Sequence, residues 1–140
     1  PFSTNYERYD NSYAMENSYN NALESGDGYK LLQLAKTEND YNMMPGVRAG
    51  DMLYNAYKVG VERRDPNLLL NIAKYEVQNN LMSGVTAGDV LTDAISAARS
   101  RNDSRTMYSI ANFEAQHNVL FGIGPDSIRN EARNMEYNRY

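Results

Sequence analysis

A segment of 38 residues occurs three times in succession in this chain of 140 residues, without a gap between copies. The copies cover 27–64, 65–102 and 103–140, and we call them repeats 1, 2 and 3. Repeats 1 and 2 share 16 of their 38 residues, and repeats 2 and 3 share 9. A fixed period of this kind indicates a repeat architecture, in which each copy is one supersecondary unit that packs against its neighbours.

The pattern inside each repeat predicts two helices joined by a short loop. In repeat 2, Asp65 and Pro66 form a typical helix start, because aspartate accepts a backbone N–H and proline suits the first helical position. Apolar residues then recur at the spacing i, i+3, i+4. Gly84 is expected to end this helix in a left-handed conformation, and Asp89 to cap the second helix. A loop of about six residues makes the two helices antiparallel.

The predicted fold class is therefore all-α: three tandem 38-residue helical hairpins, arranged as a short solenoid or a bundle. A weak apolar stripe predicts a helix over 13–26, placed as a half-repeat before repeat 1. The polar residues 1–12 are expected to form a flexible or extended N-terminal arm. Residues 13–140 are predicted to form a single helical-repeat domain.

The last repeat departs most from the others. Arg129 and Arg133 stand where repeat 2 has Leu91 and Ile95. A polar outer face is expected of a terminal repeat that meets water or a different partner.

Polar residues that stay constant across the repeats are candidates for contacts between repeats or between subunits. The glutamate and asparagine lie one turn apart beside the apolar stripe, where a carboxylate must be hydrogen-bonded or paired. The arginine ends the second helix and is the obvious charge partner, but not within one hairpin. These candidate residues are Glu38, Asn42, Arg63, Glu76, Asn80, Arg101, Glu114, Asn118 and Arg139.

An alternative explains the same residues by local capping. Here the glutamates and asparagines bind loop amides or helix ends, and each arginine neutralises the next aspartate cap. Both interpretations remain open from the sequence.

Residues typical of catalysis and cofactor binding are scarce. The chain has no cysteine and one histidine, so a disulfide framework, a thiolate metal site and a nucleophile–histidine–acid set are excluded. Glu114 and His117 have the spacing of di-iron bundles, but no second copy of the motif exists. The net charge of −4 argues against nucleic acid, and no apolar run is long enough to span a membrane. We expect no enzyme activity, no cofactor and no metal.

Part of repeat 2 resembles a known family. The order DP-x-x-LL, then Tyr75, then Leu81-Met82-Ser83, then DVLTDAI resembles the helical hairpin of type III secretion needle and inner-rod subunits. The resemblance covers about 65–97, and it implies a small helical hairpin that polymerises into a tube. It carries no functional residue over to this chain.

The sequence therefore predicts a non-enzymatic structural protein that self-assembles into a filament, tube or virion-type particle. The expected partner is a second copy of the chain in a homo-oligomer or polymer, and other proteins are possible. The alternative is a monomeric helical-repeat scaffold that binds a protein or peptide. An extracellular or surface assembly is expected, in keeping with a secreted chain that avoids thiols, and a cytoplasmic location stays open.

Overall fold

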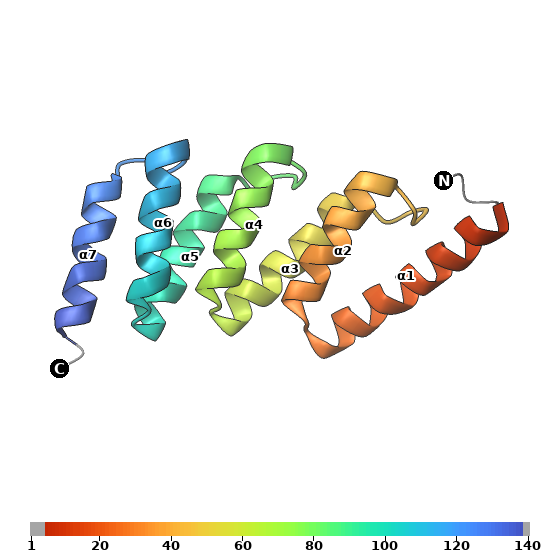
Figure 1. Ribbon diagram of the computed structural model, residues 1–140, viewed down its shortest axis with the longest axis horizontal. Helices are drawn as coiled ribbons and strands as arrows, with labels where there is room; N and C mark the ends of the chain where they lie inside the picture. Colours follow the sequence, from red (N-terminus) through yellow and green to blue (C-terminus); the bar gives the residue numbers. More distant parts are fainter. Residues whose placement is uncertain (1–4, 139–140) are drawn as a thin grey trace. The chain divides into compact units, whose positions relative to one another are not determined.

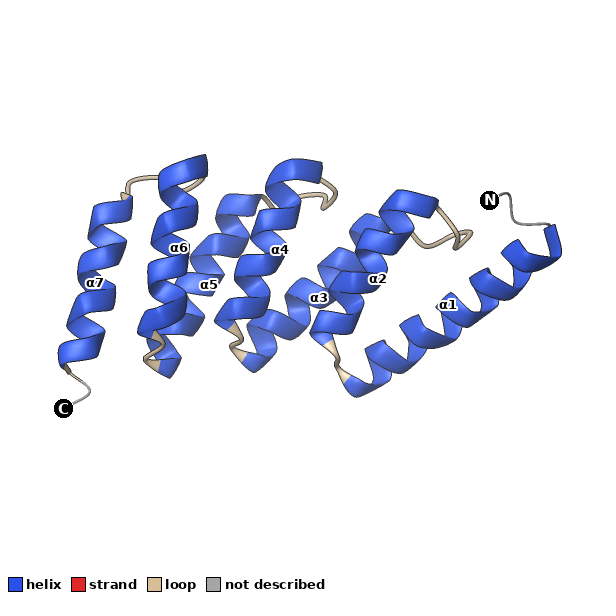
Figure 2. Ribbon diagram, in the orientation of Figure 1, coloured by secondary structure: helices blue, strands red, loops and turns tan. Residues whose placement is uncertain are grey.

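The computed structural model describes the backbone over residues 5–138 and the side chains over 11–138. All regular secondary structure in this part of the chain is helical (Figures 1 and 2). The seven helices are α1 (Asn5–Ser25), α2 (Gly28–Tyr41), α3 (Ala49–Arg63), α4 (Pro66–Asn79), α5 (Ala87–Arg101), α6 (Ser104–His117) and α7 (Pro125–Tyr137).

Each repeat forms one helical hairpin. The pairs are α2 with α3, α4 with α5, and α6 with α7. The predicted all-α class and the three tandem hairpins are therefore confirmed.

Backbone contacts divide the chain into two compact units, Pro1–Val59 and Gly60–Tyr140, which we call the N-terminal and C-terminal units. The boundary falls inside α3, so the last turn of α3 belongs to the C-terminal unit. The prediction of a single domain over 13–140 concerns the joint folding of the two units and stays a prediction.

In the N-terminal unit, α1 packs against α2. Its buried residues, Met15, Tyr19 and Ala22, recur at helical spacing on one face. The Tyr19 hydroxyl accepts a hydrogen bond of 2.7 Å from the side-chain amide of Asn55 in α3. A single apolar stripe thus attaches α1, a mostly polar helix, to the rest of the N-terminal unit.

The start of α1 corrects the predicted arm. The helix begins at Asn5, so residues 5–12 are helical rather than part of a flexible or extended segment. This stretch contains neither proline nor glycine, and a helix already nucleated downstream can propagate through such residues. Residues 1–4 of the predicted arm lie outside the described residues.

In the C-terminal unit the two hairpins stack side by side (Figure 1). Helix α6 packs against both α4 and α5, the two helices of the preceding hairpin, and pairs with α7. This is the stacking of a solenoid rather than of a closed bundle. The predicted stripe forms the core, as Leu69, Ile72 and Ala73 of α4 are fully buried. Burial of a leucine or isoleucine contributes about 1.5–3 kcal/mol.

The first helix of each repeat begins as predicted, at an aspartate. The carboxylates of Asp27, Asp65 and Asp103 accept the backbone N–H three residues ahead, at distances of 3.1, 3.1 and 3.0 Å. Such a cap contributes about 1 kcal/mol.

The second helix begins earlier than predicted. In repeat 2 the N-cap is Thr86, whose hydroxyl accepts the N–H of Asp89 at 3.1 Å. The Asp89 carboxylate in turn accepts the N–H of Thr86 at 2.9 Å, which completes a capping box. Asp51 repeats half of this arrangement by accepting the N–H of Arg48 at 3.3 Å. These aspartates therefore lie inside the first turn instead of preceding it.

The end of each first helix also differs from the prediction. The left-handed residue that follows the helix is asparagine, with φ near +50° at Asn42, Asn80 and Asn118. The glycine of each repeat lies four residues further on, and Gly84 has φ +74° inside the loop. Asparagine tolerates this conformation better than other residues with a Cβ, so it replaces the expected glycine.

Successive repeats are joined by one recurring turn. Gly26, Arg64 and Asn102 have φ of +65°, +51° and +51°. At each, the next aspartate donates its N–H to a carbonyl five residues earlier at 2.9 Å, as in a Schellman motif. Helix α1 thus ends as α3 and α5 do, in agreement with its placement as the second helix of a half-repeat.

Candidate functional site

The constant glutamate of each repeat is buried at the end of the first helix. The exposed fractions of Glu38, Glu76 and Glu114 are 2, 2 and 1%. In repeat 2, Oε1 of Glu76 accepts the N–H of Leu81 at 2.6 Å, and Oε2 accepts the N–H of Met82 at 2.9 Å. The carboxylate therefore binds two consecutive amides of its own loop.

Repeat 1 reproduces this arrangement, and in repeat 3 the carboxylate binds a single loop amide. Glu38 accepts the N–H groups of Met43 at 2.6 Å and of Met44 at 3.0 Å. Glu114 accepts the N–H of Leu120 with both oxygens, at 3.0 and 2.9 Å. In addition, the asparagine four residues after each glutamate donates its backbone N–H to the glutamate's own carbonyl oxygen, at 2.7 to 2.8 Å.

Electrostatics explains why the buried carboxylate needs loop amides as partners. The C-terminal end of a helix carries partial negative charge, which opposes a buried anion at this position. Charge-assisted hydrogen bonds from loop amides offset that repulsion and the loss of hydration. The glutamate is therefore a structural clamp that fixes the course of the loop.

These bonds correct the predicted contacts between repeats or subunits for the glutamates, whereas contacts of the asparagine side chains with another subunit stay a prediction. The glutamates bind amides of their own repeat and are too buried to reach another subunit. The asparagines act through backbone conformation at the helix end. The capping alternative is the one that the structure shows at Glu38, Asn42, Glu76, Asn80, Glu114 and Asn118.

The arginines behave differently. Nη2 of Arg101 donates to the backbone carbonyl oxygen of Arg63 at 2.9 Å, which is a contact between repeats 1 and 2. The arginine thus caps the carbonyl end of the preceding repeat's second helix. Arg139, the third candidate, lies outside the described residues.

The di-iron spacing of Glu114 and His117 does not produce a metal site of that type. The Glu114 carboxylate binds its loop, and the His117 ring lies against Phe113 with 4.6 Å between ring centroids. Among the described side chains, no group of three or more His, Cys, Asp or Glu is placed to hold a metal ion. Every buried side-chain nitrogen or oxygen over the same residues has a hydrogen-bond partner. A binding function must therefore be sought on the surface.

A surface groove of about 460 Å³ lies in the C-terminal unit, where the last turn of α3 meets α4 and α5. Its apolar lining consists of Val61, Leu69 and Ala97, and its polar lining of Arg64, Asp93, Ser96 and Ser100. Leu69 and Ala97 are buried, whereas Val61 is 43% exposed. The groove thus combines an apolar floor with a polar rim, the composition that suits a protein or peptide segment.

One repeat later, at the place that corresponds to the groove, an ion pair connects the two second helices. Arg99 of α5 donates through Nε and Nη2 to the two carboxylate oxygens of Glu131 in α7, at 2.5 and 2.9 Å. The hydrogen bond to Glu131, and then its charge, raise the pKa of Arg99, while partial burial lowers it. This bidentate contact, which we call the α5–α7 clip, links the second helices of repeats 2 and 3.

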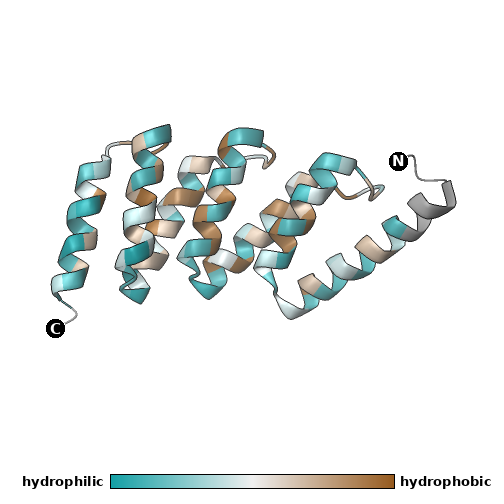
Figure 3. Cartoon of the chain, in the orientation of Figure 1, coloured by the Kyte–Doolittle hydropathy of each residue, from teal (hydrophilic) through white to brown (hydrophobic). Residues whose placement is uncertain are grey.

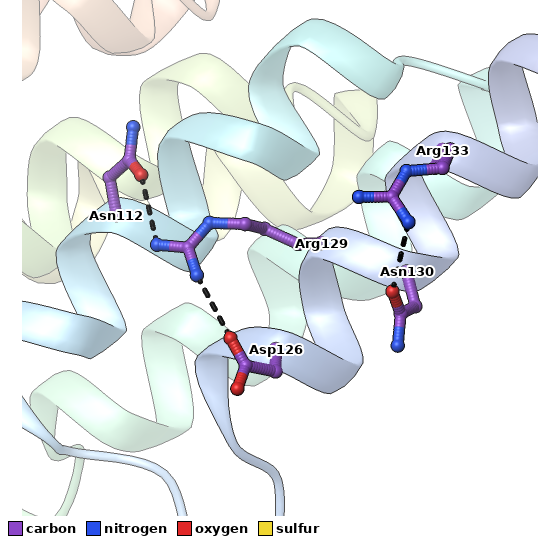
Figure 4. Close-up of polar contacts among 5 residues, drawn as sticks. All are labelled: Asn112, Asp126, Arg129, Asn130 and Arg133. Carbon is purple, nitrogen blue, oxygen red and sulfur yellow. Dashed lines mark hydrogen bonds and ion pairs between the residues drawn. The ribbon is translucent and has the colours of Figure 1, made fainter.

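The outer face of α7 is polar, as predicted (Figures 3 and 4). The Arg129 guanidinium bonds Asp126 at 3.1 Å and Asn112 of α6 at 3.4 Å, and Arg133 bonds Asn130 at 3.5 Å. In α5 the matching positions, Leu91 and Ile95, are buried. A further repeat of the same kind would therefore meet two arginines on α7 where α5 offers two aliphatic side chains.

The loop between α6 and α7 carries the most exposed aromatic side chain among the described residues. Phe121 is fully exposed at its tip, and Ile123 is 37% exposed. Repeats 1 and 2 have Pro45 and Ser83 at the position of Phe121. This is an apolar feature that the fold of the hairpin does not require.

The groove was not predicted from the sequence, although a signal for it exists. Aligning the repeats places Val61 opposite Arg99 and Asp93 opposite Glu131. The absence of the arginine from repeat 1 indicates that the clip cannot form there, but only the structure shows that the two positions face one groove.

Comparisons of the chain with protein-family models, curated proteins and solved structures give no match. None of the helices described over residues 5–138 combines the length and apolar character that crossing a membrane requires.

Proposed function

We propose that this chain is a non-enzymatic helical-repeat scaffold that binds a protein or peptide segment in the groove beside α5. The observation that carries the proposal is the groove itself, an open concavity with an apolar floor and charged and hydroxyl groups at its rim. Stacked helical hairpins commonly use such surfaces between repeats for binding.

The pattern of constancy among the repeats supports this function. Residues that set the core, the caps and the loop clamp recur, whereas the groove residues change from one repeat to the next. At four groove positions the counterparts in the following repeat differ: Val61 and Arg99, Asp93 and Glu131, Ala97 and Met135, Ser100 and Asn138. Variation at a surface feature of a scaffold whose core, caps and loop clamp recur suits a site that recognises something outside the fold.

A peptide selection tests the proposal. A library of random twelve-residue peptides is panned on the purified chain, and binders are counter-selected on a variant with the groove closed, Val61→Arg with Asp93→Glu. This variant copies the α5–α7 clip into the groove. Peptides that share a pattern and bind the wild type but not the closed variant are the expected result. Enrichment of no sequence, or equal binding to both proteins, would reject the groove as a binding site.

The second candidate is self-assembly into a filament, tube or virion-type particle. The exposed Phe121 favours it, because an aromatic side chain presented on a loop is a frequent anchor of protein contacts. The resemblance of 65–97 to needle and inner-rod hairpins points the same way. The polar face of α7 weighs against head-to-tail stacking through that end.

Sedimentation velocity with negative-stain microscopy, at micromolar protein, separates the two candidates. A single monomeric species is expected of the scaffold. Filaments or a large closed particle that disappear in Phe121→Ser would instead establish assembly through the loop. Serine is the residue that repeat 2 carries at this position.

A further inference from the structure

We propose that the groove beside α5 recognises a basic side chain of its partner, arginine above all, whose cationic head binds Asp93 while its aliphatic stem lies on Val61. This inference rests on the proposed scaffold function and specifies the chemistry of the partner.

The chain itself contains a template for this interaction. In the α5–α7 clip, the Arg99 side chain extends from the second helix of repeat 2 and donates hydrogen bonds to both carboxylate oxygens of Glu131, on the second helix of repeat 3. When the repeats are aligned, the position of Arg99 corresponds to Val61 one repeat earlier, and the position of Glu131 corresponds to Asp93. The acidic side of the clip is thus retained in the groove, whereas the basic side is replaced by valine.

The groove lies where the arginine of the clip would be. Val61 and Asp93 both line it, and valine supplies neither the length nor the charge to fill it. A carboxylate has about four acceptor positions, so Asp93 can bind a guanidinium in addition to the contacts that it already makes. An arginine supplied by a partner would complete the arrangement that repeats 2 and 3 make internally.

The lining suits the rest of an arginine as well as its head. Arginine places an apolar stem along hydrophobic surface while its charged head stays at the polar edge. Leu69 and Ala97 form a buried apolar floor, and Val61 forms an exposed apolar wall. Asp93 supplies the anionic group of the lining, to which the cationic head can bind.

Arg64 adds an independent observation. It adopts φ +51° at a turn where the matching residues are Gly26 and Asn102, the two types that tolerate this conformation. Folding alone would favour either of these over arginine, so strain at a groove residue indicates a function for its side chain. With five N–H donors and no acceptor, Arg64 suits the backbone carbonyls that flank the partner's basic residue.

Two peptides that differ in one side chain test the inference. Acetyl-Gly-Arg-Gly-amide and acetyl-Gly-Gln-Gly-amide are titrated to millimolar concentration into the ¹⁵N-labelled full chain. The arginine peptide is expected to shift the amide signals of Asp93, Ser96 and Ser100 in a saturable manner, and the glutamine peptide to bind at least about twofold more weakly. An exposed ion pair corresponds to about two- to fivefold in affinity.

Two variants locate the contact. Asp93→Asn should lower the affinity for the arginine peptide to that for the glutamine peptide, and the closed-groove variant Val61→Arg with Asp93→Glu should abolish the shifts. Asp126→Asn, which removes a carboxylate outside the groove, should change neither. Equal affinity for both peptides, no groove shifts with the arginine peptide, or unchanged binding to Asp93→Asn would overturn the inference.

The panning experiment distinguishes this failure from failure of the scaffold proposal. If the selected peptides bind the groove but share no basic residue, the scaffold function stands and the assignment to arginine falls. If no peptide binds the groove, the scaffold proposal itself fails.

Discussion

The carboxylate of Glu76 lies 2.6 Å from the backbone nitrogen of Leu81, five residues further along the chain. The same contact occurs at Glu38, and Glu114 makes its counterpart one residue later. A buried anion thus determines how each first helix turns into its loop. Since the loop sets where the second helix begins, one side chain per repeat fixes the geometry of the hairpin.

Replacement of Glu76 by glutamine should lower the free energy of unfolding by about 1–3 kcal/mol. Glutamine keeps one acceptor oxygen, but its NH₂ group faces the second loop amide and leaves that N–H unsatisfied. Urea denaturation followed by circular dichroism measures the change. Glu62→Gln is the matched control, because Glu62 is exposed on α3, and it should alter stability by less than about 0.5 kcal/mol. Equal effects of the two substitutions would remove the clamp role.

Asn80 should tolerate glycine but not alanine. Its φ of +49° costs alanine about 1 kcal/mol, whereas glycine adopts this conformation freely and keeps the N–H that binds Glu76. We expect Asn80→Ala to be less stable than Asn80→Gly by that amount in urea denaturation. If the two variants unfold at the same urea concentration, the asparagine is retained for its side chain rather than for its backbone conformation.

The repeat and its apolar stripe could be predicted because both depend only on the spacing of residues along the sequence. Identity at a period of 38 defined the hairpins, and Leu69, Ile72 and Ala73 are buried as their positions required. The aspartate caps followed from residue type alone. These features depend on residues close together in the sequence.

The role of the glutamate could not be decided in this way. Its spacing placed it near the core, but two partners were available, a distant arginine and the nearby loop amides. The choice depends on how the chain turns after Asn80, and that left-handed turn was expected at Gly84 instead. The error in the turn residue therefore carried over to the predicted contact.

Gly88 should resist replacement by alanine although it lies in a helix. An added Cβ would lie 2.4 Å from the carbonyl oxygen of Val119, in the loop of the next repeat. Backbone cannot yield as a flexible side chain does, so overpacking should cost about 1–3 kcal/mol and outweigh the helix preference for alanine. Repeat 3 carries Asp126 at this position.

Thermal unfolding of Gly88→Ala and of a control, Gly124→Ser, checks this packing. Gly124 caps α7 without a side-chain hydrogen bond, and a Cβ there meets nothing within 4 Å. Serine should therefore stabilise the chain by a few tenths of a kcal/mol. If Gly88→Ala raises the melting temperature, the loop of repeat 3 does not press on α5.

The α5–α7 clip should contribute a small coupling that depends on salt. The side chains of Arg99 and Glu131 are 53 and 34% exposed, so their pairing is worth about 0.3–1 kcal/mol in spite of its two hydrogen bonds. A double-mutant cycle with Arg99→Gln and Glu131→Gln measures this coupling in urea. At about 1 M salt, where the screening length falls to about 3 Å, the coupling should decrease. The pair Asp126 and Arg129 is the control, because Asp126 is 95% exposed and should couple less. If the changes in unfolding free energy at Arg99 and Glu131 are strictly additive, the clip orders two side chains without holding the helices together. A partner's arginine in the groove beside α5 would then gain little binding free energy from Asp93.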